Sequence, residues 1–155
     1  MKITIVAVDL RSPAWAFTAV EDYLTRFPRD WKVELKTVKE EPRHGQSKSD
    51  LMAAEADRIR QAIPKGSLLV TLDERGKDLT TVEFAKKLSA WQDSGESVAF
   101  VIGGTDGIDP ALKQESRMMI RLSSMTLPHA LARVILSEQI YRAWSILNNH
   151  PYHRA

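Results

Sequence analysis

Short runs of apolar, mostly β-branched residues alternate along the chain with longer segments in which apolar residues recur at helical spacing. Short continuous apolar runs are typical of buried strands, and the helical spacing is typical of amphipathic helices. We expect strands at residues 2–8, 31–38, 68–72, 98–102 and 118–122. Strands that alternate with helical segments predict an α/β fold, with a mostly parallel sheet flanked by helices.

The expected helices carry recognisable start and stop signals. Ser12 is the expected N-cap of a helix that begins at Pro13, and Thr80 and Glu83 have the spacing of a capping box. The charged segment Lys39–Ser49 contains a proline and a glycine, which predicts a mobile loop. The expected helices cover residues 13–28, 50–63, 81–93, a short stretch from 110, and 128–147.

Length and composition fit one domain that spans residues 1–155. Of the 155 residues 43% are hydrophobic, which is enough to build a core. Cysteine is absent, which excludes disulfides, cysteine-based zinc sites and thiol nucleophiles, and agrees with a reducing compartment. The sequence shows neither an apolar run long enough to cross a membrane nor a signal-peptide pattern, so we expect a cytoplasmic protein.

Positive charge is concentrated in the last third of the chain. The formal net charge is +2 overall, but residues 111–155 carry +4 and the remainder carries −2. Three of the four histidines also lie in this segment. A local basic surface of this kind attracts polyanions such as RNA. From charge alone, solvated helix faces are the alternative explanation.

Three of the expected strands end in polar or glycine-rich segments. These segments are Leu72-Asp73-Glu74, Ile102-Gly103-Gly104 and Leu122-Ser123-Ser124. In open α/β sheets ligands bind beyond the carboxyl ends of the strands, so we expect the three segments to line one pocket. Asp73 is a candidate contact for a ribose hydroxyl, whereas Glu74 is more simply a solvated carboxylate. Residues 103–107 match neither the dinucleotide fingerprint nor the phosphate-binding P-loop.

The turn at residues 122–129 and the tail at 148–154 have compositions that suit a binding site better than a core. His129, at the start of the last expected helix, could accept a proton, contact a phosphate or simply be a polar helix start. No metal site is expected, because Pro151 lies between His150 and His153 and no third ligand is apparent. Serine hydrolase chemistry is not expected either, because the chain has no Gly-x-Ser-x-Gly elbow.

Three C-terminal motifs resemble those of a known family. They are SSMTLPHALAR (123–133), ILSEQIYRAWSI (135–146) and NHPYHR (149–154), and the opening KITIVAV and Ile102-Gly103-Gly104 extend the likeness over essentially the whole chain. The chain resembles the RlmH family of ribosomal large-subunit pseudouridine N3-methyltransferases, which have the SPOUT fold. The resemblance implies a C-terminal trefoil knot, whereas the strand and helix pattern alone predicts an ordinary unknotted sheet.

The resemblance also implies a cofactor and partners. The cofactor is S-adenosyl-L-methionine, and the substrate is a pseudouridine in helix 69 of 23S rRNA in the assembled ribosome. Family members are homodimers that pack through the last helix, whose apolar stripe is wide enough to meet a second protein. With Asp73 added from the strand-end pattern, the expected cofactor-binding residues are Leu72, Asp73, Gly103, Gly104, Leu122, Ser123, Ser124, Met125, Thr126 and Leu127.

Roles for the remaining polar residues follow from the same resemblance. The candidate catalytic residues are His129, Tyr152, His153 and Arg154, and the resemblance leaves open which of them is the base. Arg133, Arg142 and Arg154 are the candidate RNA contacts. Glu40 and Glu41 depart from the basic loop expected at this point, so the contribution of residues 39–49 to ribosome docking is in doubt. A non-catalytic nucleotide- or RNA-binding α/β ribosome-assembly module is the alternative function.

Overall fold

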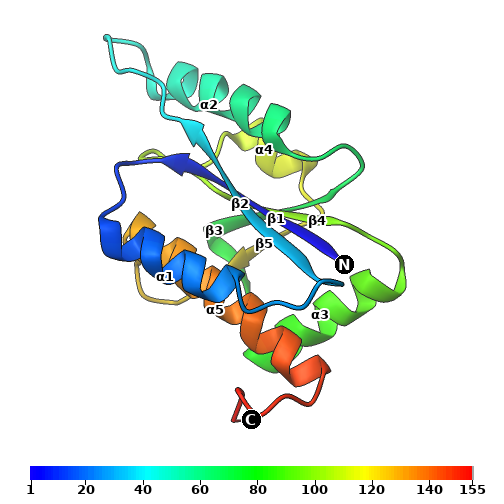
Figure 1. The fold of residues 1–155 in the computed structure, drawn as a ribbon. Coiled ribbons are helices and arrows are strands. Elements are labelled where there is room, and N and C mark those ends of the chain that lie inside the picture. The colour runs from blue at the N-terminus through cyan, green and yellow to red at the C-terminus, as the bar shows by residue number, and fades with distance from the viewer. Residues whose placement is uncertain (155) are drawn as a thin grey trace.

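A five-stranded parallel sheet forms the centre of the computed structural model, which describes residues 1–154 (Figure 1). The strand order is β2-β1-β4-β3-β5, and every pair of neighbours is parallel. The sheet is therefore fully parallel, in agreement with the predicted fold class. The strands are β1 (Lys2–Asp9), β2 (Lys32–Lys39), β3 (Leu68–Asp78), β4 (Val98–Ile102) and β5 (Met118–Arg121).

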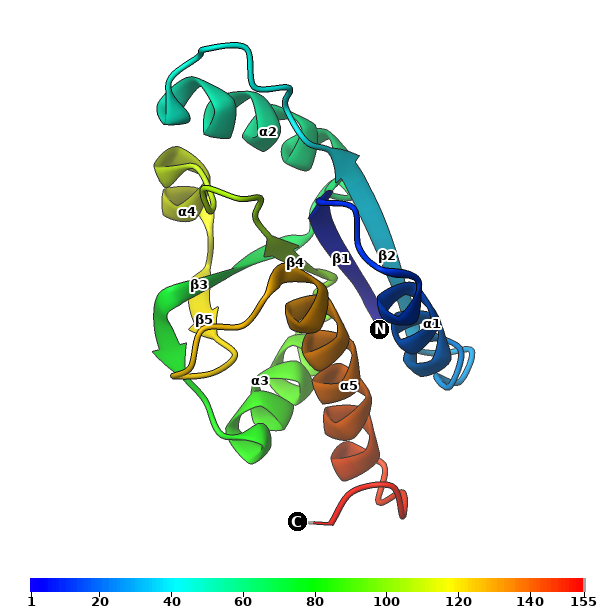
Figure 2. The ribbon, with the colours of Figure 1, turned by 90° about the vertical axis from the view of Figure 1, so that its left-hand side faces the viewer.

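Helices cover both faces of the sheet (Figures 1 and 2). Helices α1, α3 and α5 lie on one face, where α5 packs against both α1 and α3. Helices α2 and α4 lie on the other face. The helices are α1 (Ala14–Leu24), α2 (Lys48–Ala62), α3 (Thr81–Asp93), α4 (Pro110–Glu115) and α5 (His129–Leu147). No helix within residues 1–154 is long and apolar enough to cross a membrane.

The alternation of side chains along β1 explains why both faces are covered. Ile3 and Ile5 belong to a core shared with α3 and α5, whereas Val6 and Val8 belong to a second core shared with α2 and α4. All four side chains are fully buried. Because each buried aliphatic side chain contributes roughly 1.5–3 kcal/mol, a central strand of this kind stabilises both layers at once.

Strand β3 is longer than the apolar pattern predicts. We expected it to end at Leu72 in a polar turn, but it continues through Asp78. Its pairing with β5 shifts register between Leu72 and Lys77, so the intervening residues form an irregular stretch in the ladder. Bulged strands can present polar residues that a regular strand would not. Asp73 and Glu74 therefore lie in an irregular part of a strand, and the predicted turn is wrong.

The start of α1 also differs from prediction. Pro13, and not Ser12, occupies the N-cap position, and no side chain caps the helix. Trp15 and Phe17, two large apolar side chains of α1, are 52% and 46% exposed. Large apolar side chains exposed in this way commonly mark an interaction surface. The capping box at Thr80 is present as predicted.

Candidate active site

A cavity of about 730 Å³ opens at the carboxyl ends of β4 and β5, beside the irregular stretch of β3 that follows Leu72. The three strand-end segments that the sequence singled out do line one pocket. Nine of the ten expected cofactor-binding residues contribute to its wall, and Ser124 does not. They are Leu72, Asp73, Gly103, Gly104, Leu122, Ser123, Met125, Thr126 and Leu127.

One wall of the cavity is the tight loop after β4, residues 103–107. Gly107 has a φ of +90°, and its N–H donates a hydrogen bond of 3.1 Å to the carbonyl of Gly104. A Cβ on Gly103 would come within 2.7 Å of the Gly107 carbonyl carbon, so only glycine fits there. Gly103 and Gly104 therefore bring backbone groups to the cavity wall, which Thr105 and Asp106 also line.

A second wall carries an ion pair. Nζ of Lys113, on α4, lies 2.7 Å from Oδ2 of Asp73, and the N–H of Arg75 donates to Oδ1 at 2.8 Å. Burial on its own would raise the pKa of Asp73, but these two hydrogen bonds outweigh it and the pKa is lowered. Asp73 is therefore a carboxylate with a fixed orientation, able to accept further hydrogen bonds from a ligand.

The third wall is the connection from β5 to α5. Ser123 accepts a hydrogen bond of 2.9 Å from the N–H of Met125, which turns the chain back along the cavity. Leu122 and Leu127 add apolar surface, while Met125 is 77% exposed at the rim. Apolar surface beside open backbone groups is typical of a pocket for a small organic ligand.

Comparison with known proteins accounts for this arrangement. Residues 1–153 match the family described as "Predicted SPOUT methyltransferase". The chain belongs to this methyltransferase family. It is 57% identical to the "Ribosomal RNA large subunit methyltransferase H" of Paracidovorax citrulli over 154 residues, which is 99% of both chains. It is 53% identical to the protein of the same name from Burkholderia thailandensis over 156 residues, which is 100% of both. Membership of the SPOUT methyltransferases makes the chain an enzyme and disfavours the alternative of a non-catalytic module.

His129 lines the cavity, but in a form that is poorly suited to proton transfer. Both ring nitrogens are shielded from solvent and have no hydrogen-bond partner among the described residues. Burial and, to a smaller extent, the charge of Arg133 lower the pKa of His129 to about 4, and the Gly103 backbone and Asp9 offset only part of this shift. The imidazole is therefore neutral at physiological pH. A ring with so low a pKa is a weak base, and the role of His129 in proton handling stays a prediction.

Arg133 does not lie where an RNA contact would be. Its side chain is fully buried, with Nη2 3.4 Å from the carbonyl oxygen of Val8 and the guanidinium 5.9 Å from the ring of Phe17. Burial lowers its pKa. The predicted contact with RNA is at odds with this position, because a buried guanidinium cannot reach a phosphate at the surface.

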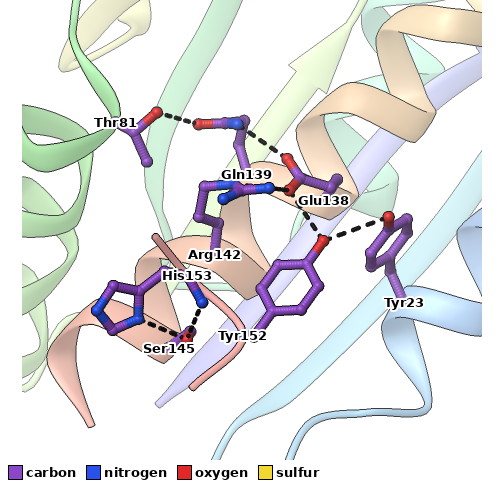
Figure 3. A network of polar contacts seen from close by, with 8 residues as sticks. All are labelled: Tyr23, Thr81, Glu138, Gln139, Arg142, Ser145, Tyr152 and His153. Atoms are coloured by element: carbon purple, nitrogen blue, oxygen red, sulfur yellow. Dashed lines mark hydrogen bonds and ion pairs between the residues drawn. The ribbon is translucent and has the colours of Figure 1, made fainter. Parts of the chain in front are cut away.

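The tail folds back on the C-terminal half of α5 (Figure 3). The Tyr152 hydroxyl donates to Oε1 of Glu138 at 3.0 Å and approaches the Tyr23 hydroxyl at 3.4 Å. Nδ1 of His153 lies 2.8 Å from Oγ of Ser145, which also accepts the His153 N–H at 3.2 Å. Burial and the hydrogen bonds with Tyr23 and Glu138 raise the pKa of Tyr152. Arg154 is exposed beyond these contacts.

The structure thus separates two groups of predicted catalytic residues. His129 is at the N-terminal end of α5, beside the cavity, whereas Tyr152 and His153 contact Glu138 and Ser145 farther along the helix. At a rise of about 1.5 Å per residue, these contacts lie roughly 14–24 Å from His129 along the helix axis. Arg142 lies with the tail, and its Nε donates to Glu138 at 2.7 Å. None of the described tail residues, 148–154, lines the cavity of its own chain.

Sequence reasoning missed Leu10 and Lys113 as parts of the cavity wall. Leu10 follows β1, and the order β2-β1-β4 brings the end of this strand beside that of β4. Lys113, on α4, reaches the same wall through its ion pair with Asp73. The alternation of strands and helices gives no strand order, so no signal in the sequence could have placed either residue. Within residues 1–154, no group of three or more His, Cys, Asp or Glu side chains could hold a metal ion.

Proposed function

We propose that this protein methylates N3 of a pseudouridine in helix 69 of 23S rRNA, on the assembled ribosome, with S-adenosyl-L-methionine as the methyl donor. The observation that carries the proposal is the cavity at the ends of β4 and β5, beside the irregular stretch of β3, built from the segments that the family resemblance singles out. The names of the relatives, large-subunit rRNA methyltransferases, support an rRNA substrate for this chain.

The residues of the cavity fit the proposed cofactor. Leu72, Leu122 and Leu127 offer apolar contacts for an adenine ring, and the loop at 103–107 offers backbone amides and carbonyls. Asp73 offers a carboxylate for ribose hydroxyls. When bound, S-adenosylmethionine supplies a methyl group that its sulfonium already activates. A neutral His129 is compatible with this positive charge, whereas an imidazolium would repel it.

The chain's task is to align the target nitrogen with the methyl group and exclude water, because the methyl group itself needs no further activation. The N3 proton must also leave, and a positive field favours the deprotonated imide. The raised pKa of Tyr152 keeps its hydroxyl protonated at neutral pH, so Tyr152 cannot accept the N3 proton. We propose that Arg154 supplies the positive field and that Tyr152 and His153 position the target nucleobase.

We propose that the enzyme is a homodimer and that the tail of one protomer acts at the cavity of the other. The tail is docked away from the cavity of its own chain, so residues 152–154 need a second copy to meet a bound cofactor. The exposed Trp15 and Phe17 on α1 and Leu131 on α5 supply apolar surface on two helices that pack together. Such surface suits a protein interface.

Three further expectations belong to the same proposal. Residues 1–155 act as a single catalytic domain. The connection from β5 to α5 forms the trefoil knot of the SPOUT fold. An enzyme that works on assembled ribosomes acts in the cytoplasm. Each of these rests on the family resemblance and not on the contacts described above.

Substrate recognition is expected to depend on the ribosome more than on RNA sequence. Arg142 and Arg154 are the proposed phosphate contacts, with the exposed Arg117 as support. Phosphate contacts position a protein on RNA but carry no sequence information. A chain of this size therefore needs the surrounding shape of the ribosome to select one nucleotide.

Methyl transfer from labelled S-adenosylmethionine tests the proposal. Ribosomes that lack the modification should accept the label, and purified 23S rRNA should accept far less. Label in free RNA at the same rate would contradict recognition of the assembled ribosome. No transfer to either substrate would contradict an rRNA methyltransferase.

A further inference from the structure

The loop at residues 40–47, between β2 and α2, lies against the wall of the cavity. Its partner is the tight loop after β4, residues 103–107, which we call the cavity loop. The two segments are about sixty residues apart in sequence, and two side-chain contacts join them directly. The family resemblance placed the 40–47 loop at the ribosome surface and gave it no part in cofactor binding.

The outer contact between the loops is an ion pair. Nη2 of Arg43 lies 2.6 Å from Oδ2 of Asp106, and the Asp106 side chain is only 12% exposed whereas that of Arg43 is 49% exposed. Thr105 adds a hydrogen bond of 3.3 Å to Oε2 of Glu40. Asp106 and Thr105 both line the cavity. An arginine outside the cavity therefore neutralises a mostly buried carboxylate in its wall.

The inner contact is made by Glu55, a carboxylate on α2 that is only 7% exposed. Its Oε2 accepts a hydrogen bond of 3.0 Å from the N–H of Glu41 in the 40–47 loop. Its Oε1 faces the cavity loop so closely that a Cβ on Gly104 would come within 2.8 Å of it. One side chain thus touches both loops and fixes the spacing between them.

The N-terminal end of the 40–47 loop is also held in place. Arg58, also on α2, pairs with the carboxylate of Glu41 and donates to the carbonyl of Lys39 at 3.1 Å. Helix α2 therefore holds the 40–47 loop through Glu55 and Arg58, while Arg43 links this loop to the cavity loop. Because the cavity loop presents backbone groups to the ligand, a shift of even part of an ångström would misplace them.

We propose that Arg43 and Glu55 are positioning residues for the methyl-donor site. They act through Asp106 and Gly104, hold the cavity loop in its binding geometry, and make the 40–47 loop part of the cofactor site. The proposal rests on the proposed function, since it concerns how that site binds S-adenosylmethionine. It predicts that cofactor affinity depends on a side chain that does not line the cavity.

Titration calorimetry with S-adenosylmethionine, on the isolated full-length protein, tests the proposal. Arg43→Ala should weaken binding about fivefold, the upper end of what a partly exposed ion pair contributes. Arg43→Lys should restore much of the loss, because it keeps a charge that can reach Asp106. In an Asp106→Asn background, Arg43→Ala should cause no further loss, since its partner is already gone.

Arg60→Ala is the matched control. Arg60 lies on the same helix as Glu55, its side chain is 35% exposed and it pairs with Glu115 at 2.9 Å, but it does not line the cavity. The Arg60→Ala variant should bind S-adenosylmethionine with the affinity of the wild type. In turnover assays with ribosomes in excess, Arg43→Ala should raise KM for the cofactor and leave kcat unchanged, which general loss of structure would not do.

Two results would overturn the proposal. One is wild-type affinity in Arg43→Ala, and the other is an undiminished effect of Arg43→Ala in the Asp106→Asn background. Failure of the wild type to bind S-adenosylmethionine would instead contradict the proposed function. Thermal unfolding of each variant, compared with Arg60→Ala, establishes that the measured protein is folded.

Discussion

The Tyr152 hydroxyl donates a hydrogen bond of 3.0 Å to Oε1 of Glu138, which ties the C-terminal tail to the middle of α5. The same oxygen accepts a hydrogen bond of 2.7 Å from Nε of Arg142. Arg142 also lies 5.1 Å from the centre of the Tyr152 ring. One carboxylate therefore organises the aromatic and cationic residues that we propose to act on the substrate (Figure 3).

Tyr152→Phe should loosen the tail without disturbing the cavity. A single hydrogen bond to a charged group that keeps its other partner contributes about 1 kcal/mol, so amide protection of the tail backbone should fall about fivefold. Hydrogen exchange of residues 152–154 measures this directly. Protection equal to that of the wild type would mean that ring packing on Tyr141, rather than the hydrogen bond, holds the tail.

Local patterns were sufficient for most of the fold. Strand β4 is apolar at all five positions and buried throughout, and the capping box at Thr80 sets the start of α3. These features depend on neighbours in sequence. The continuation of β3 past Leu72 depends instead on pairing with β5, which holds polar residues in a strand that their own propensity would not form.

The cavity could be predicted from sequence better than the tail. Parallel strands place their carboxyl ends at one edge of the sheet, so segments that follow such strands are expected at a common edge. The docking of Tyr152 depends on Tyr23 and Glu138, and the burial of Arg133 depends on Val8 and Phe17. Contacts between residues so far apart in sequence have no local signal. The family resemblance implied roles for the tail residues, but it did not indicate how far they lie from the cavity of their own chain.

Two inactive variants should restore activity to each other if the tail acts at a partner's cavity. Deletion of residues 150–155 removes the tail, and Thr126→Trp fills the cavity with a bulky ring. In a co-expressed heterodimer, the intact tail of the Thr126→Trp chain faces the intact cavity of the deleted chain. We expect up to half of wild-type turnover, measured as methyl transfer to ribosomes.

The matched control is the Thr126→Trp homodimer, which keeps both tails and should stay inactive. If the purified heterodimer is as inactive as either parent, the proposed exchange of tails is wrong. The deleted chain alone should still bind S-adenosylmethionine, because its cavity is unchanged.

The pH dependence of stability should report the buried His129. Its pKa is lowered to about 4, from an ordinary value of 6.5, so the unfolded chain binds more protons between these limits. The contribution of this residue to the free energy of unfolding is complete above pH 6.5 and is lost as the pH falls towards 4. The loss is at most about 3 kcal/mol.

Urea unfolding at pH 7 and pH 5 measures the effect. His129→Gln should remove part of the decline in stability seen in the wild type, because glutamine does not titrate. His44→Gln changes an exposed histidine in the 40–47 loop and should keep the wild-type decline. An identical decline in wild type and His129→Gln would show that the imidazole is not buried in its neutral form.

Asp73→Asn should weaken binding of S-adenosylmethionine about tenfold or more, because hydrogen bonds to a charged acceptor contribute roughly 1.5–3 kcal/mol. The loss of charge also leaves Lys113 without its ion-pair partner at the cavity wall. Titration calorimetry gives the affinity. Glu74→Gln is the matched control, since Glu74 lies at the same cavity but is exposed. Equal affinities in the two variants would exclude a specific role for Asp73.

The site of methylation is the most direct test of the function proposed here. Ribosomes from a strain without this activity would be incubated with the enzyme and S-adenosylmethionine, and the 23S rRNA would be mapped by mass spectrometry of its fragments and nucleosides. We predict one new methyl group, on N3 of a pseudouridine in helix 69. A methyl group on another nucleotide, or on another atom of that pseudouridine, would contradict it.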